Sequence, residues 1–160
     1  MFIRKKRIKN SEYAYLVSSE WTPLGPRQKV SKYIGKIVYI NVKGIPSFSV
    51  DMDSFFSRAE IISYIIEQNL LFCGFQKEGN LLKNEKIHLD IKERKIISSK
   101  RTLVLSLNEG FLCKDSIDQL FDFQERGDSD VGKKLATLLV NAGLVVPKEV
   151  FVSLYEKFYS

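Results

Sequence analysis

The sequence predicts an α+β fold made of a small N-terminal antiparallel β-sheet, a central helix, a second short antiparallel sheet and a C-terminal helical region. Runs rich in Ile, Val, Leu and Tyr occupy residues 2–42 and recur at 87–107, which is typical of strands. Apolar residues recur every three or four positions from residue 57 and again beyond residue 115, which indicates amphipathic helices. The 160 residues are 44% hydrophobic and 12% aromatic, a composition typical of a folded core.

The first predicted element is a β-hairpin. Residues 2–9 and 12–22 are two β-prone runs, and the pair Asn10-Ser11 between them favours a turn. Because side chains alternate along a strand, the second run presents two different sets on its two faces. One set is Tyr13, Tyr15 and Val17, and the other is Ala14, Leu16 and Ser18.

Two further extended segments complete the N-terminal sheet. Residues 23–26, Pro-Leu-Gly-Pro, predict a loop that interrupts the sheet. Residues 28–34 form a third run that we expect Gly35 to close, and residues 36–42 continue as extended chain. The first 43 residues therefore predict a small antiparallel sheet of three or four strands.

Positive charge is concentrated in this predicted sheet. The first 43 residues hold ten of the 25 Lys and Arg but two of the 19 Asp and Glu, a net charge of +8, while the remainder of the chain carries −2. Such local basicity is typical of a surface that contacts a polyanion. The charge balance changes sign at residues 44–47, Gly-Ile-Pro-Ser, so we divide the chain into a basic β-module, 1–43, and an α+β body, 44–160, which ends in three helices. The sequence leaves open whether the two parts share one core.

Four segments of the N-terminal module follow one another in a recognisable order: Phe2-Ile3-Arg4-Lys5-Lys6, residues 12–19, Arg27-Gln28-Lys29-Val30 and Tyr33-Ile34-Gly35. In this order the module resembles the N-terminal β-module of insertion-element transposases and of related archaeal mobile-element-like proteins. The resemblance covers about residues 1–40, and it departs from the pattern at Trp21, where a basic residue is common, and at residues 24–26, which replace a simpler glycine turn. A transposase catalytic domain does not fit in the remaining chain, so the resemblance implies DNA handling without transposition.

The segment 50–56, Val-Asp-Met-Asp-Ser-Phe-Phe, resembles the strand-to-helix motif in which translesion DNA polymerases hold magnesium. Asp51 and Asp53 would be the ligands, and carboxylate oxygens suit that ion. No second acidic pair follows, and the chain is too short for a polymerase. We therefore interpret these acids as residues that precede a helix, whose first turn is marked by the capping box Ser57 to Glu60.

Helical and extended segments alternate through the body. A helix over 57–69 has its apolar stripe on Ile61, Ile62, Ile65, Ile66 and Leu70, and we expect Gly74 to stop it. Residues 76–80 predict a polar turn, and 87–91, 95–98 and 102–107 predict the second antiparallel sheet.

Three helices are predicted after the second sheet. Asp115 or Ser116 would cap the first, and the second, 130–142, would end at Gly143. Pro147 would open the last helix in its first turn.

The remaining motif-bearing residues predict no cofactor, metal site or catalytic centre. Cys73 and Cys113 are isolated thiols, expected to be reduced core residues, and the single histidine, His88, alternates with apolar neighbours. We expect no membrane association and a cytoplasmic location, since no apolar run of about 18 residues and no signal-peptide pattern occurs.

We hypothesise a nucleic-acid-binding accessory protein, with DNA preferred to RNA, that contacts phosphates through the basic sheet and stacks bases on exposed aromatic rings. We do not expect an enzyme. The predicted contact residues are Arg4, Lys5, Lys6, Arg7, Lys9, Trp21, Arg27, Lys29, Lys32, Tyr33 and Lys36. The alternative is an interaction or assembly subunit whose C-terminal helices bind a protein partner or a second copy of the chain, and which could act on an RNA-rich complex.

Overall fold

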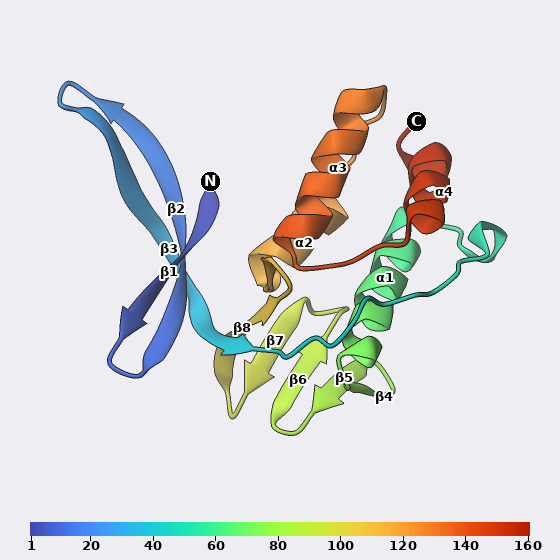
Figure 1. The fold of residues 1–160 in the computed structure, drawn as a ribbon, viewed down its shortest axis with the longest axis horizontal. Coiled ribbons are helices and arrows are strands. Elements are labelled where there is room, and N and C mark those ends of the chain that lie inside the picture. The colour runs from blue at the N-terminus through green and yellow to red at the C-terminus, as the bar shows by residue number, and fades with distance from the viewer.

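Three long antiparallel strands begin the chain and form an arm that extends away from the helices (Figure 1). The computed structural model describes the backbone of residues 1–160 and every side chain except that of Ser129. The strands of the arm are β1 (Phe2–Ile8), β2 (Ser11–Thr22) and β3 (Gly25–Tyr39). The predicted first hairpin is confirmed, because β1 pairs with β2 from Phe2 opposite Val17 to Ile8 opposite Ser11.

The body contains short strands on which the helices pack, so the predicted α+β class is confirmed. An irregular segment leads from β3 to the 3-10 turn η1 (Met52–Ser54). The helices of the described chain are α1 (Arg58–Phe72), α2 (Lys114–Asp122), α3 (Ser129–Asn141) and α4 (Lys148–Phe158). The strands of the body are β4 (Gln76–Glu78), β5 (Leu81–Asn84), β6 (Ile87–Asp90), β7 (Lys95–Ser98), β8 (Arg101–Leu107) and β9 (Gly110–Leu112).

The arm and the body share one sheet, whereas the sequence predicted two. The strand order is β1-β2-β3-β8-β7-β6-β5-β4, with β9 paired to β8. The connection is a parallel ladder in which Lys36 to Tyr39 of β3 lie opposite Leu103 to Ser106 of β8. A pairing between segments so distant in sequence leaves no local signal, which is why periodicity alone indicated separate sheets.

Gly35 does not end the third strand as predicted, because β3 runs through it to Tyr39. Its role lies in the contact with β8. A Cβ atom at position 35 would lie 2.8 Å from the carbonyl oxygen of Thr102, which is closer than Cβ atoms approach other atoms. The glycine therefore permits the close approach of β3 to β8.

The interruption predicted for residues 23–26 is a tight hairpin turn. β2 ends at Thr22 and β3 resumes at Gly25, with Trp21 opposite Pro26 in the ladder. The pairing register shifts twice along β2 and β3. Ile34 has no partner between Ala14 and Tyr15, and Ser31 has none between Leu16 and Val17, so each is a bulge in β3. Such bulges strengthen the local twist of a strand pair.

Three short strands of the body depart from prediction. The predicted polar turn over 76–80 contains β4, which forms a hairpin with the unpredicted strand β5. The chain also forms β9 after Asn108, before it enters α2. Strands of three or four residues are too short to show a period that distinguishes them from turns.

The helix boundaries follow the predicted capping signals with small shifts. Ser57 and Glu60 form the predicted capping box of α1, which continues to Phe72 before Gly74 adopts φ +91°. Cys113, and not Asp115 or Ser116, is the N-cap of α2. The backbone N–H of Cys113 donates a hydrogen bond to the Ser116 hydroxyl at 3.0 Å. The predicted C-terminal glycine of α3 is confirmed, since Gly143 has φ +75°. Pro147 is the N-cap of α4, one position before the predicted first turn.

Strand β8 contributes to two hydrophobic clusters. Leu103, Leu105 and Leu107 lie in the main core, which includes the fully buried isoleucines of α1. Val104 lies in a smaller cluster with Ala14, Ile34, Ile37 and Cys113, beneath the base of the arm. The alternation of β8 thus joins the arm to the body on both faces of the sheet.

In the described part of the chain, no helix has the length and apolar character that crossing a membrane requires.

Candidate nucleic-acid interface

The arm has one face that carries three tyrosines. Tyr13 and Tyr15 of β2 share this face by strand alternation, and both rings contact Tyr33 of β3, with centroids 6.3 and 5.5 Å apart. Tyr33 remains half exposed at the centre of the group. Burial first, and then the neighbouring tyrosines, raise the pKa of the Tyr33 hydroxyl above its ordinary value. We call this surface the tyrosine face.

Basic residues lie among these rings. Arg4 stands opposite Tyr15, and Lys6 opposite Tyr13, in the β1–β2 ladder, so both belong to the tyrosine face. Lys36 of β3 is the partner of Tyr13 on the other side. In the described chain, none of these three forms an ion pair, and Arg4 donates to the Gln28 amide oxygen at 2.7 Å. Their positive charge is therefore uncompensated by neighbouring carboxylates.

Apart from Lys9, the other predicted lysines and arginines lie on the opposite face of the arm, where the acids are. Lys29 is 3.7 Å from Glu20, and Lys32 is 3.0 Å from Asp115 of α2. Glu12 accepts a hydrogen bond from the Tyr39 hydroxyl. Both acids of the first 43 residues thus lie on the face opposite Tyr13, Tyr15 and Tyr33. We call this surface the ion-pair face.

Lys5, Arg7 and Arg27 complete the ion-pair face. Lys5 donates to the Tyr39 hydroxyl at 3.3 Å, and this hydrogen bond raises the pKa of the Lys5 ammonium. Arg7 and Arg27 are the ladder partners of Glu12 and Glu20. The structure therefore divides the predicted contact residues between two faces, and a flat ligand can reach only one set at a time.

Lys9 and Trp21 lie at the two ends of the arm. Lys9 occupies the β1–β2 turn with φ +55°, and its carbonyl accepts from Arg7 Nε at 3.4 Å. Trp21 stands next to the β2–β3 turn and is 86% exposed. Among the described side chains, Trp21 forms no aromatic pair with the three tyrosines.

Arg101 is a basic neighbour of the tyrosine face that sequence reasoning missed. It begins β8, is exposed, and lies close enough to Tyr33 to lower the pKa of that hydroxyl in opposition to burial. The parallel pairing of β3 with β8 brings it there from 68 positions away in the sequence. A search of the first 43 residues alone could not have found it.

The tyrosine face is hollowed next to Tyr15. A depression of ≈ 300 Å³ is lined by residues of all three strands of the arm: Arg4, Lys5 and Lys6 of β1, Tyr15 and Val17 of β2, and Val30 of β3. Strand alternation places the side chain of Lys5 on the other face. Apolar side chains beside cationic ones offer a surface on which a flat, negatively charged ligand can rest.

Asp51 and Asp53 lie at the short 3-10 turn that precedes α1. Asp51 is the N-cap of η1 and accepts from the Asp53 backbone N–H at 3.1 Å and from the Ser54 hydroxyl at 3.0 Å. The sequence favoured this placement, because it interpreted both acids as residues that precede a helix. Among the described side chains, no three His, Cys, Asp or Glu residues gather as a metal site would require.

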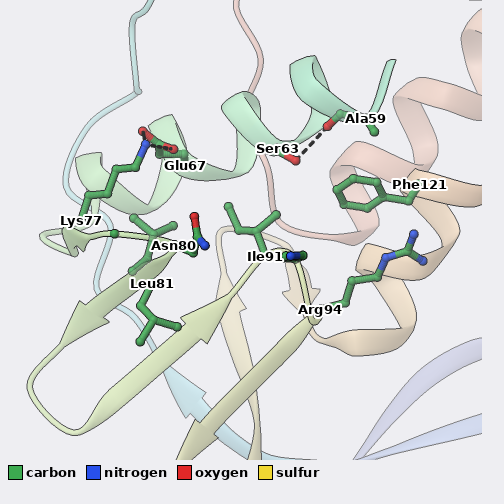
Figure 2. A pocket seen from close by; sticks show the side chains of 12 residues that line it. Ala59, Ser63, Glu67, Lys77, Asn80, Leu81, Ile91, Arg94 and Phe121 are labelled. Carbon is green, nitrogen blue, oxygen red and sulfur yellow. Dashed lines mark hydrogen bonds and ion pairs between the residues drawn. The ribbon is translucent and has the colours of Figure 1, made fainter. Parts of the chain in front are cut away.

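A second cavity, of ≈ 430 Å³, lies between α1 and the loops of β4 to β7 (Figure 2). Three basic residues line it. Lys77 pairs with Glu67 at 3.0 Å and Arg94 with Asp118 at 2.9 Å, whereas the exposed Lys92 forms no ion pair with a described side chain. Because acids of the chain pair with two of these three cations, this cavity is a weaker candidate for an anionic ligand than the tyrosine face, where Arg4, Lys6 and Lys36 have no such partners.

The chain has no match among protein-family models, curated proteins or solved structures. The resemblance of residues 1–40 to a transposase module therefore stays a prediction. The case for a ligand at the tyrosine face rests on the geometry and charge of that surface.

Proposed function

We propose that this protein binds nucleic acid, with DNA preferred to RNA, through the tyrosine face of its arm. The observation that carries the proposal is the separation of charge. Arg4, Lys6 and Lys36 lie beside the tyrosines without acidic partners, while Glu12 and Glu20 lie on the other face. A surface that gathers cations without carboxylates attracts phosphates and releases their counterions on binding.

The tyrosines give the surface a second way to hold a nucleic acid. A half-exposed ring such as Tyr33 offers a π-face to an unpaired base, a contact worth about 1 to 3 kcal/mol. Arg101 extends the cationic surface on the body side of the cluster. Phosphate contacts of this kind position the protein without reading sequence, so the proposed binding has little sequence preference.

The two faces of β1 allow a matched test. The double variant Arg4→Gln, Lys6→Gln removes two cations from the tyrosine face, and Lys5→Gln, Arg7→Gln removes two from the ion-pair face of the same strand. Both variants have the same net charge. Binding to single-stranded DNA, duplex DNA and RNA is measured against salt concentration, for example by fluorescence anisotropy.

We expect the first variant to reduce the slope of log K against log salt by about 1.8 on duplex DNA and about 1.4 on single strands. The second variant should change the slope by much less, because Lys5 and Arg7 face Tyr39 and Glu12. Equal effects of the two variants would contradict the assignment to the tyrosine face. Absence of salt-dependent binding in the wild type would refute the function itself.

A role in binding a protein partner is the second candidate, and one surface favours it. An apolar groove of ≈ 280 Å³ lies between α3 and α4, bounded by Leu139, Leu144 and Phe151. Val140 at its edge is 52% exposed. A second copy of the chain is the partner that can be tested with the purified protein alone. Light scattering across a concentration series, on the wild type and Val140→Glu, tests whether this groove joins two copies.

A further inference from the structure

The outer part of the arm is a two-stranded ribbon. β1 reaches no further along β2 than Val17, so the five ladder pairs from Ser18 opposite Lys29 to Thr22 opposite Gly25 have no third strand. At about 3.3 Å per residue, this ribbon is roughly 16 Å long. Figure 1 shows this ribbon at the upper left, where the turn between β2 and β3 lies far from every helix.

The end of the ribbon is apolar. Trp21 is 86% exposed and Leu24 is 83% exposed, and both stand at a turn that the Thr22 hydroxyl closes by donating to the Gly25 carbonyl at 2.7 Å. Pro23 lies within the turn, and Pro26 is the ladder partner of Trp21. The two prolines restrict the backbone on both sides, so the turn holds its apolar side chains in a defined place. We call residues 21–25 the tip.

The position of Trp21 relates the tip to the tyrosine face. Trp21 follows Tyr13, Tyr15 and Val17 at two-residue spacing along β2, so it extends the same row. A nucleic acid held on the tyrosine face would therefore meet Trp21 at the outer end of the arm. The major groove of a duplex, about 12 Å wide, admits a two-stranded ribbon of this kind.

We propose that the tip inserts Trp21 and Leu24 as a wedge into a base step of duplex DNA, and that it selects steps already weakened by a bulge or a mismatch. Apolar side chains inserted between base pairs must unstack them, and that cost is similar in size to the stacking energy that one aromatic ring regains. Insertion is therefore favoured where the step is already open. This inference rests on the proposed function, because the phosphate contacts of the tyrosine face bring the tip to the duplex.

Trp21 is the single tryptophan of the chain, so its fluorescence reports on the tip alone. The full-length protein is titrated with a duplex containing one unpaired base and with the fully paired duplex of otherwise identical sequence. Acrylamide, which is neutral, measures the accessibility of Trp21 in each complex. We expect a severalfold loss of quenching on the bulged duplex, and binding of that duplex about tenfold tighter than the paired one.

Two tip variants separate insertion from phosphate binding. Leu24→Ser keeps the fluorescent probe and should restore part of its accessibility, and Trp21→Ala should reduce the preference for the bulged duplex to about twofold or less. Because both side chains are exposed, we expect the far-UV circular dichroism of the variants to match that of the wild type. The salt slope should stay at the wild-type value, since neither change removes a charge.

The outcomes distinguish the inference from the function on which it rests. Salt-dependent binding in which Trp21 stays as accessible as in the free protein would overturn the wedge and leave the proposed function standing. Absence of binding to every nucleic acid would overturn both. Protection of Trp21 by vesicles containing phosphatidylserine, without protection by either duplex, would assign the tip to a membrane surface and overturn the wedge.

Discussion

The close contact between Gly35 and β8 predicts that adding a single methyl group at position 35 lowers the stability of the folded protein. In Gly35→Ala, the new Cβ would lie 2.8 Å from the Thr102 oxygen, 3.2 Å from its carbonyl carbon and 3.4 Å from that of Leu103. Ordinary contact begins at 3.4 Å, so the strands must separate by about 0.6 Å at this point. A ladder hydrogen bond of about 2.9 Å would lengthen toward 3.5 Å, at the limit of its useful range.

The expected size of the effect follows from two opposing contributions. Overpacking against backbone costs about 1 to 3 kcal/mol, and replacing glycine in the unfolded chain returns about 0.4 to 1 kcal/mol. The midpoints of these two ranges leave a net loss of about 1.3 kcal/mol in the free energy of unfolding, or roughly 3 to 5 °C in melting temperature for a chain of this size. Urea unfolding followed by circular dichroism measures it.

Gly132→Ala is the matched control for this change. Gly132 lies within α3, and its added Cβ would meet the Tyr155 ring at 3.5 Å, an ordinary contact. The two variants make the same chemical change in a crowded strand and in a helix. Wild-type stability in Gly35→Ala would refute the close approach of β3 to β8, and with it the joining of arm and body into one sheet.

The remaining predictions concern stability. Gly132→Ala should raise the free energy of unfolding by up to about 1 kcal/mol, as alanine does within a helix, and chemical denaturation would show the increase. Burial raises the pKa of Tyr159 to about 12, and in the described chain its hydroxyl has no hydrogen-bond partner. Tyr159→Phe should therefore be neutral or stabilising at pH 7. It should also remove the loss of stability that the wild type undergoes as pH rises from 10 to 12, where the unfolded tyrosine ionises first. A larger alkaline loss in the variant than in the wild type would contradict this. Burial acts to raise the pKa of Asp118, but hydrogen bonds from Lys114 and Arg94 outweigh it and hold that pKa below 3.8. Asp118→Asn should cost at most about 1 kcal/mol at pH 7, and the difference from wild type should vanish as pH falls below 3.8 and through the lower folded value; a difference that is constant from pH 7 to pH 2 would exclude the ion pairs as its cause.

Local patterns predicted much of this fold because their causes are local. The capping box at Ser57 satisfies the first turn of α1, and the β-prone runs on either side of Asn10-Ser11 form the first hairpin. The role of Gly35 could not be predicted in this way. A glycine inside a β-prone run predicts an ending unless the strand that will lie against it is known.

The candidate interface was predictable in composition but not in arrangement. The count of charged residues located the basic module. The alternation of side chains along the second strand placed Tyr13 and Tyr15 on the face opposite the buried Ala14. The bulges in β3 shift its alternation relative to β2, so the faces on which Lys32 and Tyr33 lie could not be derived from spacing alone. The approach of Asp115 and Arg101 to the arm depends on the tertiary fold, which no local pattern encodes.

The parallel ladder between β3 and β8 also sets an order for folding during synthesis. Lys36 lies opposite Leu103, so 67 residues separate the two partners. At about 5 to 20 residues per second, a ribosome needs roughly 3 to 13 s to supply β8 after β3 has been made. During that time the hairpin of β2 and β3 has an open edge and leaves Ile34 and Ile37 without their later cover. The lysines of β3 then serve the nascent chain as well as the finished protein, because charge along an open edge opposes pairing with other chains.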